Sequence, residues 1–217
     1  MTGKADAARL LVLDLLGLVA AGGGAPARAQ SAAVGTVTDL VGVAVVTRHQ
    51  AGAAEPLAVG AELFEGDRVH TEAGARLRLR LRDGSVLTCG EATDLELDWV
   101  LYDAEEDARS VLLSVPLGIV RAVAELLRPS SMFEMRTNTA VISVRGSEWI
   151  AEAQPDATAV LSLEGEIAVR NADPDVPGAV VLGPGEGVTV EAGAPPPAPT
   201  VWGEARRNSF LERTAVP

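Results

Sequence analysis

The stretch TNTAVISVRGSEW, from Thr137 to Trp149, does more than any other to indicate the fold class of this chain. An alternating run with Ile142 and Val144 on one face ends at Gly146, while the opposite face becomes polar at Arg145. Such a run reads as a buried strand, and a glycine after it permits a positive φ or a close backbone approach. We therefore expect a strand that ends in a sharp corner.

The residues after the strand complete this interpretation. Arg145 is expected to pack its aliphatic stem across the bend and to pair its guanidinium with a carboxylate such as Glu148. Trp149 is expected to cover the bend as a large apolar plug. A catalytic role for Arg145 is the alternative, but no nucleophile and base accompany it in the sequence. The corner is therefore interpreted as structural.

Period-two alternation bounded by glycine and aspartate recurs through most of the chain, which is typical of strands joined by tight turns. In LRLRLR, Leu77, Leu79 and Leu81 share one face and arginines occupy the other. RDGS, residues 82–85, separates two alternating runs and predicts a tight turn. The predicted fold class is all-β, either a β-solenoid-like stack or a sandwich of short strands.

Only one internal segment has helical spacing. In GIVRAVAELLRPSS the apolar residues Val120, Val123, Ala124 and Leu127 predict a short helix near 119–128, which Pro129 would end. The same residues also fit the extension of a strand. From residue 193 onward the chain is Pro-rich, so residues 193–217 are predicted as a tail that leaves the compact body and ends in a short helix or in disorder.

The N-terminus has the layout of a secretory signal peptide. Lys4 and Arg9 precede an apolar stretch, and Ala27-Arg28-Ala29 resembles an A-x-A cleavage site. Asp14 within the apolar stretch departs from the pattern, and an unstructured N-terminus is the alternative. Residues 1–29 are predicted as the signal, and the mature protein is then expected to be periplasmic or secreted, without stable membrane insertion.

Composition narrows the classes of partner. The formal net charge is −12, which argues against a general nucleic-acid binder, because such proteins neutralise phosphates with cations. Cys89 is the only cysteine, so no internal disulfide is expected. It follows an apolar run and is predicted to be a small buried core residue.

The sequence offers little for catalysis. The histidines, His49 and His70, are far apart, and no G-x-S-x-G motif accompanies them. Cys89 and the two histidines do not form a clustered ligand set for a metal, and GPGEG lacks the Lys-Ser/Thr of a phosphate-binding loop. We predict no enzymatic activity and no cofactor.

One strand face has binding character. Its arginines alternate with leucines on one predicted strand and would form a positive stripe, namely Arg76, Arg78, Arg80 and Arg82. One interpretation is a solvated face paired with acidic cross-strand neighbours such as Glu96 and Asp98. The other is a site for an anionic partner: a polysaccharide, a lipid headgroup or an acidic protein surface.

These motifs resemble those of the FecR-type domain, in this order along the chain: the block VGAELFEGDRVHTEAGARLRLRLRDGSVL, then TNTAVISVRGSEW, LEGEIAV and LGPGEGVTV. Asn138, Ser147 and Trp149 replace the usual Pro, Thr and Phe of the second motif. The resemblance covers residues 34–192. The motif residues it identifies are Gly66, Asp67, Thr71, Asp83, Gly84, Thr137, Val144, Arg145, Gly146, Ser147 and Trp149.

The resemblance implies an extracytoplasmic all-β module. The best-known members regulate iron-siderophore uptake, where a cytoplasmic helical segment binds a sigma factor and the periplasmic part receives a signal. Because this sequence opens with a signal-like segment, the sigma-factor half is not carried over. The expected function is protein–protein interaction or signal sensing in the cell envelope. A structural or glycan-binding secreted module is the alternative.

Overall fold

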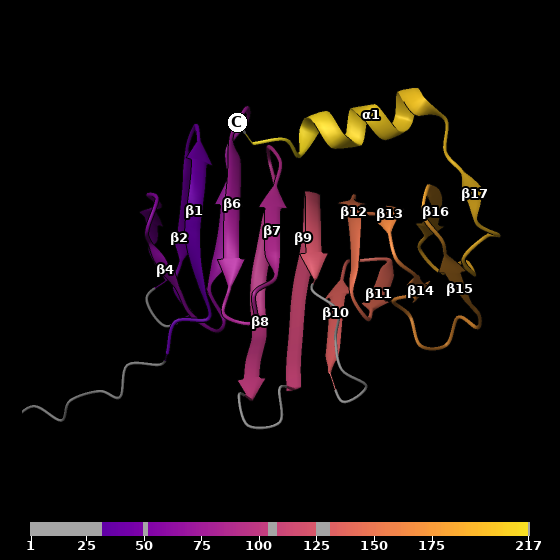
Figure 1. Ribbon diagram of the computed structural model, residues 1–217, viewed down its shortest axis with the longest axis horizontal. Helices are drawn as coiled ribbons and strands as arrows, with labels where there is room; N and C mark the ends of the chain where they lie inside the picture. The colour runs from indigo at the N-terminus through magenta and orange to yellow at the C-terminus, as the bar shows by residue number, and fades with distance from the viewer. Residues whose placement is uncertain (1–31, 50–51, 104–107, 125–130, 217) are drawn as a thin grey trace, which may run out of the picture. The chain divides into compact units, whose positions relative to one another are not determined.

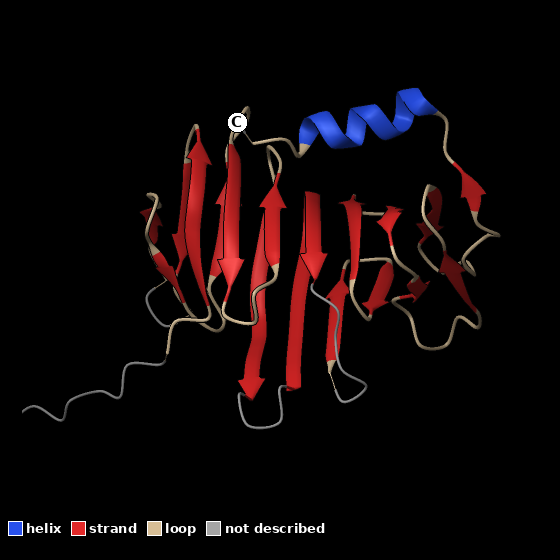
Figure 2. Ribbon diagram, in the orientation of Figure 1, coloured by secondary structure: helices blue, strands red, loops and turns tan. Residues whose placement is uncertain are grey.

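The computed structural model describes residues 32–49, 52–103, 108–124 and 131–216. The predicted signal peptide, residues 1–29, lies outside the described residues. The described secondary structure consists of seventeen strands and one helix near the C-terminus (Figures 1 and 2). The predicted all-β class is confirmed. None of the helical segments that the structure describes has the length and hydropathy required to cross a bilayer.

The strands form two layers, which we call sheet A and sheet B. Sheet A runs, in spatial order, through β4 (Glu62–Leu63), β1 (Gly35–Val41), β6 (Arg76–Leu81), β7 (Val86–Cys89), the second part of β9 (Ala108–Ala124), β12 (Ser147–Ala153), β13 (Ala157–Glu164), β16 (Glu186–Glu191) and β17 (Thr200–Val201).

Sheet B runs through β3 (Ala54–Pro56), β2 (Ala44–Thr47), β5 (Arg68–Thr71), β8 (Asp94–Asp103), the first part of β9, β10 (Met132–Arg136), β11 (Ala140–Val144), β14 (Ile167–Asn171) and β15 (Ala179–Leu182). Neighbouring described strands are antiparallel, apart from the parallel pair β9–β10. Of the two predicted arrangements, the structure has the sandwich.

The core lies between the layers and follows the alternation of the sequence. On β6 the leucines at positions 77, 79 and 81 are at most 2% exposed, while the arginines between them point outward. Trp149 on β12 and Phe133 on β10 are fully buried and meet edge to face, with ring centroids 5.2 Å apart. Contact across the two inner faces therefore produces one continuous hydrophobic cluster.

Strand β9 belongs to both layers. Residues 108–117 pair with β8 in sheet B, and residues 118–124 pair with β7 and β12 in sheet A. Gly118, at the crossing, has φ +99°. A Cβ atom there would lie 2.4 Å from Cα of Thr93, so only glycine fits.

The predicted helix near 119–128 is wrong for residues 119–124, which are strand. Val120, Ala122 and Ala124 face the core, so the period is two and the helical spacing is coincidental. The strands on both sides, β7 and β12, offer hydrogen bonds along this segment that a helix would leave unmade. Residues 125–128 lie outside the described part of the chain.

Of the two alternatives for the last residues, the structure has the helix. α1 (Glu204–Arg213) lies over the outer face of sheet A (Figure 2). Trp202 and Phe210 pack onto outward apolar residues of β9, β12 and β13, namely Ile119, Ile150, Ala159 and Leu161. Trp202 sits directly on Gly187, where a Cβ atom would come within 2.2 Å of the indole. The helix therefore covers an apolar patch that the strands leave open.

Candidate functional site

The first group of motif residues holds the turn that leads into β5. Asp67 is 2% exposed, and its carboxylate accepts hydrogen bonds from Arg48 Nη1 at 2.5 Å and from the backbone N–H of Phe64 at 2.9 Å. Gly66 has φ +78°, and a Cβ atom there would lie 2.7 Å from the ring of His49. Arg48 neutralises the buried Asp67, so neither residue is free for chemistry.

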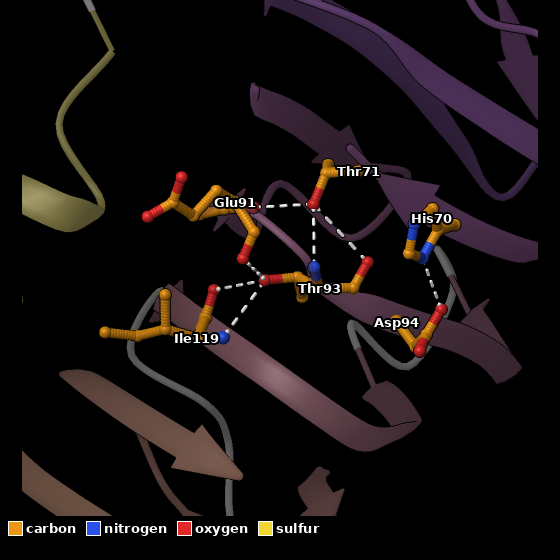
Figure 3. A network of polar contacts seen from close by, with 7 residues as sticks. His70, Thr71, Glu91, Thr93, Asp94 and Ile119 are labelled. Carbon is orange, nitrogen blue, oxygen red and sulfur yellow. Dashed lines mark hydrogen bonds and ion pairs between the residues drawn. The ribbon is translucent and has the colours of Figure 1, made fainter. Parts of the chain in front are cut away.

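Thr71 belongs to a polar network at the crossing of β9 (Figure 3). Its hydroxyl donates to Gly90 O at 2.6 Å and accepts from the backbone N–H of Thr93 at 2.9 Å. The Thr93 hydroxyl in turn accepts from the backbone N–H of Ile119 at 3.0 Å. These buried bonds satisfy backbone groups that the change of layer would otherwise leave unpaired.

Asp83 and Gly84 form the predicted turn between β6 and β7. Asp83 accepts from the backbone N–H and the hydroxyl of Ser85 at 3.1 and 2.6 Å, and Gly84 has φ +93°. The side chain closes the turn in the manner of an Asx turn. Both residues therefore set the register of the hairpin that carries the arginines.

The stretch from Thr137 to Trp149 spans a change of layer. β11 lies in sheet B and β12 in sheet A, and Gly146 between them has φ +101°. The Ser147 hydroxyl donates to Glu166 O at 3.0 Å, and a Cβ atom on Gly165 would lie 2.6 Å from that hydroxyl oxygen. The corner after β11 thus packs tightly against the turn between β13 and β14.

At the start of the same stretch, Thr137 Oγ1 accepts from the backbone N–H of Ala140 at 2.9 Å and lies 2.6 Å from Thr158 Oγ1. Val144 and Trp149 are buried at the two sides of the corner. The Trp149 indole N–H has no hydrogen-bond partner among the described residues. The side chain therefore contributes volume and aromatic contact rather than polar contact.

The expected pairing of Arg145 with Glu148 is wrong. Glu148 binds Arg121 of β9, with Arg121 Nε to Glu148 Oε1 at 2.6 Å, because β9 and β12 are neighbours in sheet A. Arg145 is exposed and makes no ion pair with any described residue. It lines a hollow of about 430 Å³ with Met132, Ala168 and Val181 on the outer face of sheet B.

The arginine stripe lies on the outer face of sheet A, and its expected partners are wrong. Glu96 binds Arg68 at 2.9 Å, and Asp98 accepts from Ser114, both in sheet B. The acidic neighbour of the stripe is Asp39 on β1, 3.4 Å from Arg78. The register β1–β6 brings these two residues opposite each other, which the sequence alone did not reveal.

A groove of about 580 Å³ crosses the outer face of sheet B. It runs over β5, β8, β9 and β10, and its polar lining includes Arg68, His70, Asp94, Glu96, Ser114, Arg136 and Asn138. His70 Nδ1 lies 2.7 Å from Asp94 Oδ1, and Arg136 Nε donates to Glu134 Oε1 at 2.6 Å (His70 and Asp94 in Figure 3). The charged groups of the groove are thus paired, His70 with Asp94 across β5 and β8 and Arg136 with Glu134 along β10.

Asp98, beside the groove, accepts a 2.7 Å hydrogen bond from the Ser114 hydroxyl. Burial raises the pKa of this carboxyl, and repulsion from Glu96 adds to the rise, while the Ser114 bond opposes it. Among the residues that the structure describes, no cluster of three His, Cys, Asp or Glu side chains is placed to hold a metal ion.

An apolar strip adjoins the groove. Trp99 and Leu101 of β8 and Met132 of β10 are 47%, 51% and 48% exposed. Trp99 lies opposite Leu112, and Leu101 and Met132 flank Ser110 from its two sides. We call Trp99, Leu101, Leu112 and Met132 the sheet B strip; sequence reasoning missed it.

The strip was missed because the alternation of buried and exposed residues breaks within β8. Leu95 and Leu97 face the core, and continued period two would put Trp99 beside them. A register shift between Glu96 and Trp99 instead turns Trp99 outward and Val100 inward. The run DLELDWVLYD does not show where this bulge falls.

Comparisons with known proteins agree with the motif resemblance. Residues 67–168 match the family described as FecR protein. This range contains every motif residue named above except Gly66. A comparison with curated proteins found no match.

Two crystal structures of a "putative anti-sigma factor from Parabacteroides distasonis ATCC 8503" share the fold. One is 17% identical with a TM-score of 0.52, and covers 66% of this chain and 63% of its own. The other is 18% identical with a TM-score of 0.53, and covers 66% of this chain and 64% of its own. The match therefore spans less than two thirds of each of those proteins, and at this identity it shows the fold alone.

Proposed function

We propose, from the match of residues 67–168 to the family described as FecR protein, that the chain is a regulatory, non-enzymatic module of the cell envelope that transmits a signal by binding a protein partner. The signal-like N-terminus supports a periplasmic or secreted location. The anti-sigma-factor name of the two structural neighbours supports a role in signal transduction.

The observation that carries the binding proposal is the sheet B strip. Sheet A has an apolar patch on its outer face too, but α1 covers it. On sheet B a tryptophan and a methionine stay about half exposed in one cluster, bordered by paired charges of the groove. Exposed aromatic and methionine side chains with a polar rim are typical of protein interfaces.

The motif residues have a different role in this proposal. Asp67, Thr71 and Asp83 are buried and hydrogen-bonded to nearby backbone, so they hold turns and layer crossings. Asp67 holds the turn into β5 and Thr71 holds the crossing of β9, and both of these strands line the groove. A partner would contact the surface of the strip and the groove and not these three buried residues.

The experiment is affinity capture from an envelope extract of the producing organism, with the purified chain as bait. We expect one discrete protein to be recovered, and Trp99→Ser with Leu101→Ser to reduce its recovery at least about tenfold, as for loss of a buried aromatic anchor. Val59→Ser is the matched control, since Val59 is 63% exposed on a loop away from the strip. Equal recovery with the strip variant would exclude this surface.

The arginine stripe supports a second candidate, a bound anionic polymer. Arg80 and Arg82 are exposed, make no ion pair with any described residue, and line a hollow of about 370 Å³ with Thr36. Two guanidinium groups next to an open hollow suit a carboxylated or sulfated glycan. In the same capture experiment, Arg80→Ser with Arg82→Ser would then abolish recovery of polysaccharide and leave protein recovery unchanged.

A further inference from the structure

One edge of sheet B lacks the features that normally prevent edge-to-edge pairing. β3, at one end, contains Glu55 and ends in Pro56. β15, at the other end, has the sequence AVVL, with no charge and no proline. Its backbone pairs with β14, and the described backbone hydrogen bonds include none to its other side. Uncharged edge strands with free N–H and C=O groups are templates for another strand.

On the neighbouring strand β14 and the residue before it, charged side chains lie at equal distances along the chain on the two sides of the position opposite Val181. On β14, Ala168 lies opposite Val181 and Arg170 lies opposite Ala179. Extending the same register places Glu166 opposite Gly183. Val181 is 57% exposed, and Glu166 and Arg170 are exposed and make no ion pair with a described residue. An apolar centre thus has an anion on one side and a cation on the other.

We propose that β15 pairs antiparallel with β15 of a second copy of this chain, about a two-fold axis beside Val181. Residues on the same face must oppose each other in a continued sheet, so Val181 meets Val181 and Ala179 meets Gly183 of the second copy. The free edges of the two β15 strands then pair with each other, while Gly183 keeps its own turn with Glu186, and sheet B continues through both copies (β15 lies at one end of its layer in Figure 1).

The positions of Arg170 and Glu166 favour a second copy of this chain as the partner over an unrelated strand, because the two charges complement each other across the two-fold axis. In this register Arg170 shares a row with Glu166 of the second copy, across three strand spacings of about 4.8 Å each. Ala179 and Gly183 lie between them in this row, and the Glu186 carboxylate, which accepts from the backbone N–H of Gly183 at 2.8 Å, adds a second acidic group beside Gly183. The two-fold axis repeats the pair on the other side of Val181, as an isologous interface requires.

The test is sedimentation of the purified chain over concentrations from roughly 1 µM to 1 mM, the range of weak association. We expect a monomer–dimer equilibrium that Val181→Lys abolishes, because two ammonium groups would face each other across the axis. Val59→Lys, the same change on an exposed loop, is expected to leave dimerisation unchanged. A monomer at every concentration, or a dimer that survives Val181→Lys, would overturn the proposal.

A charge swap tests the register. Glu166→Arg alone and Arg170→Glu alone each create like-charge pairs and are expected to weaken the dimer about tenfold or more. The double variant restores opposite charges and is expected to recover the wild-type association. If the double variant is as weak as the single ones, the proposed pairing is wrong. Binding through the sheet B strip does not enter this readout, so its failure is distinguishable.

Discussion

At the residue scale, buried polar groups of this protein stabilise turns and strand crossings by pairing with nearby charged or backbone groups. Asp67 is paired with Arg48, and the hydroxyls of Thr71 and Thr93 are committed to backbone groups at the crossing of β9. Asp98 differs, because it is half-buried beside another carboxylate, Glu96. Ionised Asp98 therefore destabilises the folded state, because its charge is partly desolvated and is repelled by Glu96.

Asp98→Asn is expected to stabilise the protein at neutral pH. The folded-state pKa of Asp98 is raised, so the folded state binds the proton more tightly than the unfolded state does. This stabilises the protein below the unfolded pKa, and the stabilisation is lost as pH rises through the folded pKa. Above the folded value the carboxyl is ionised in both states, and the folded state bears the cost of the buried charge. Asparagine keeps the acceptor for Ser114 without the charge.

Urea unfolding at two pH values measures this effect. The expected gain is below about 1 kcal/mol at pH 7, since the site is partly solvated, and it should disappear near pH 3. Asp175→Asn, on an exposed loop, is the control. A gain that is equal at both pH values would contradict the electrostatic origin.

At the element scale, β9 joins the layers and its crossing is the most constrained point of the backbone. Its first part pairs with β8 and β10 and its second part with β7 and β12. Between them, Gly118 combines a positive φ with direct contact to Thr93. Both sheets therefore depend on a residue without a side chain at this position.

Gly118→Ala is expected to lower the free energy of unfolding far more than a Gly→Ala substitution at a positive-φ position that has open space around it. Gly60 is the matched position, with φ +87° and no described neighbour within 4 Å of the place that a Cβ atom would occupy. Gly60→Ala should cost about 1–3 kcal/mol from backbone strain. Gly118→Ala should cost at least about 1–3 kcal/mol more, from overpacking against Thr93.

The measurement is the free energy of unfolding of both variants from urea titrations monitored by tryptophan fluorescence. Equal losses at the two positions would show that the contact with Thr93 is relieved cheaply. In that case the crossing would be less constrained than its geometry indicates.

At the scale of the whole molecule, α1 covers a second apolar cluster on the outer face of sheet A, and the two layers enclose the main core. Cys89 lies inside it on β7, fully buried, and burial raises the pKa of its thiol to about 12. A thiolate forms in the native state only when solvent reaches the space between the layers. Reaction of this thiol therefore reports opening of the sandwich.

We expect native Cys89 to react with a disulfide reagent at pH 8 only at the rate of global unfolding, with the urea dependence of that transition. Ser209→Cys adds an exposed thiol on α1 as an internal control, which should react at once. Rapid reaction of Cys89 in the native protein would mean that sheet A opens locally, as partial unfolding rather than a cooperative transition.

Sequence patterns were sufficient for much of this fold because alternation and glycine placement are local. The leucines of β6, the RDGS turn and the glycine corner after Val144 depend on chain neighbours and were predicted correctly in their local conformation. The motif order also indicated the likeness to the FecR family, whose model matches residues 67–168. These features follow from side-chain size and backbone freedom at single positions.

The remaining features depend on which strands become neighbours, and local patterns do not specify that. Residues 119–124 fit a helix until β7 and β12 flank them. Glu148 reaches Arg121 rather than Arg145, and Asp39 rather than Glu96 lies beside the arginine stripe. The bulge in β8 exposes Trp99 and so creates the sheet B strip. The sequence by itself determined an alternating, glycine-cornered all-β chain; only the tertiary structure decided its partners across strands, because hydrogen-bond register is settled between segments distant along the chain.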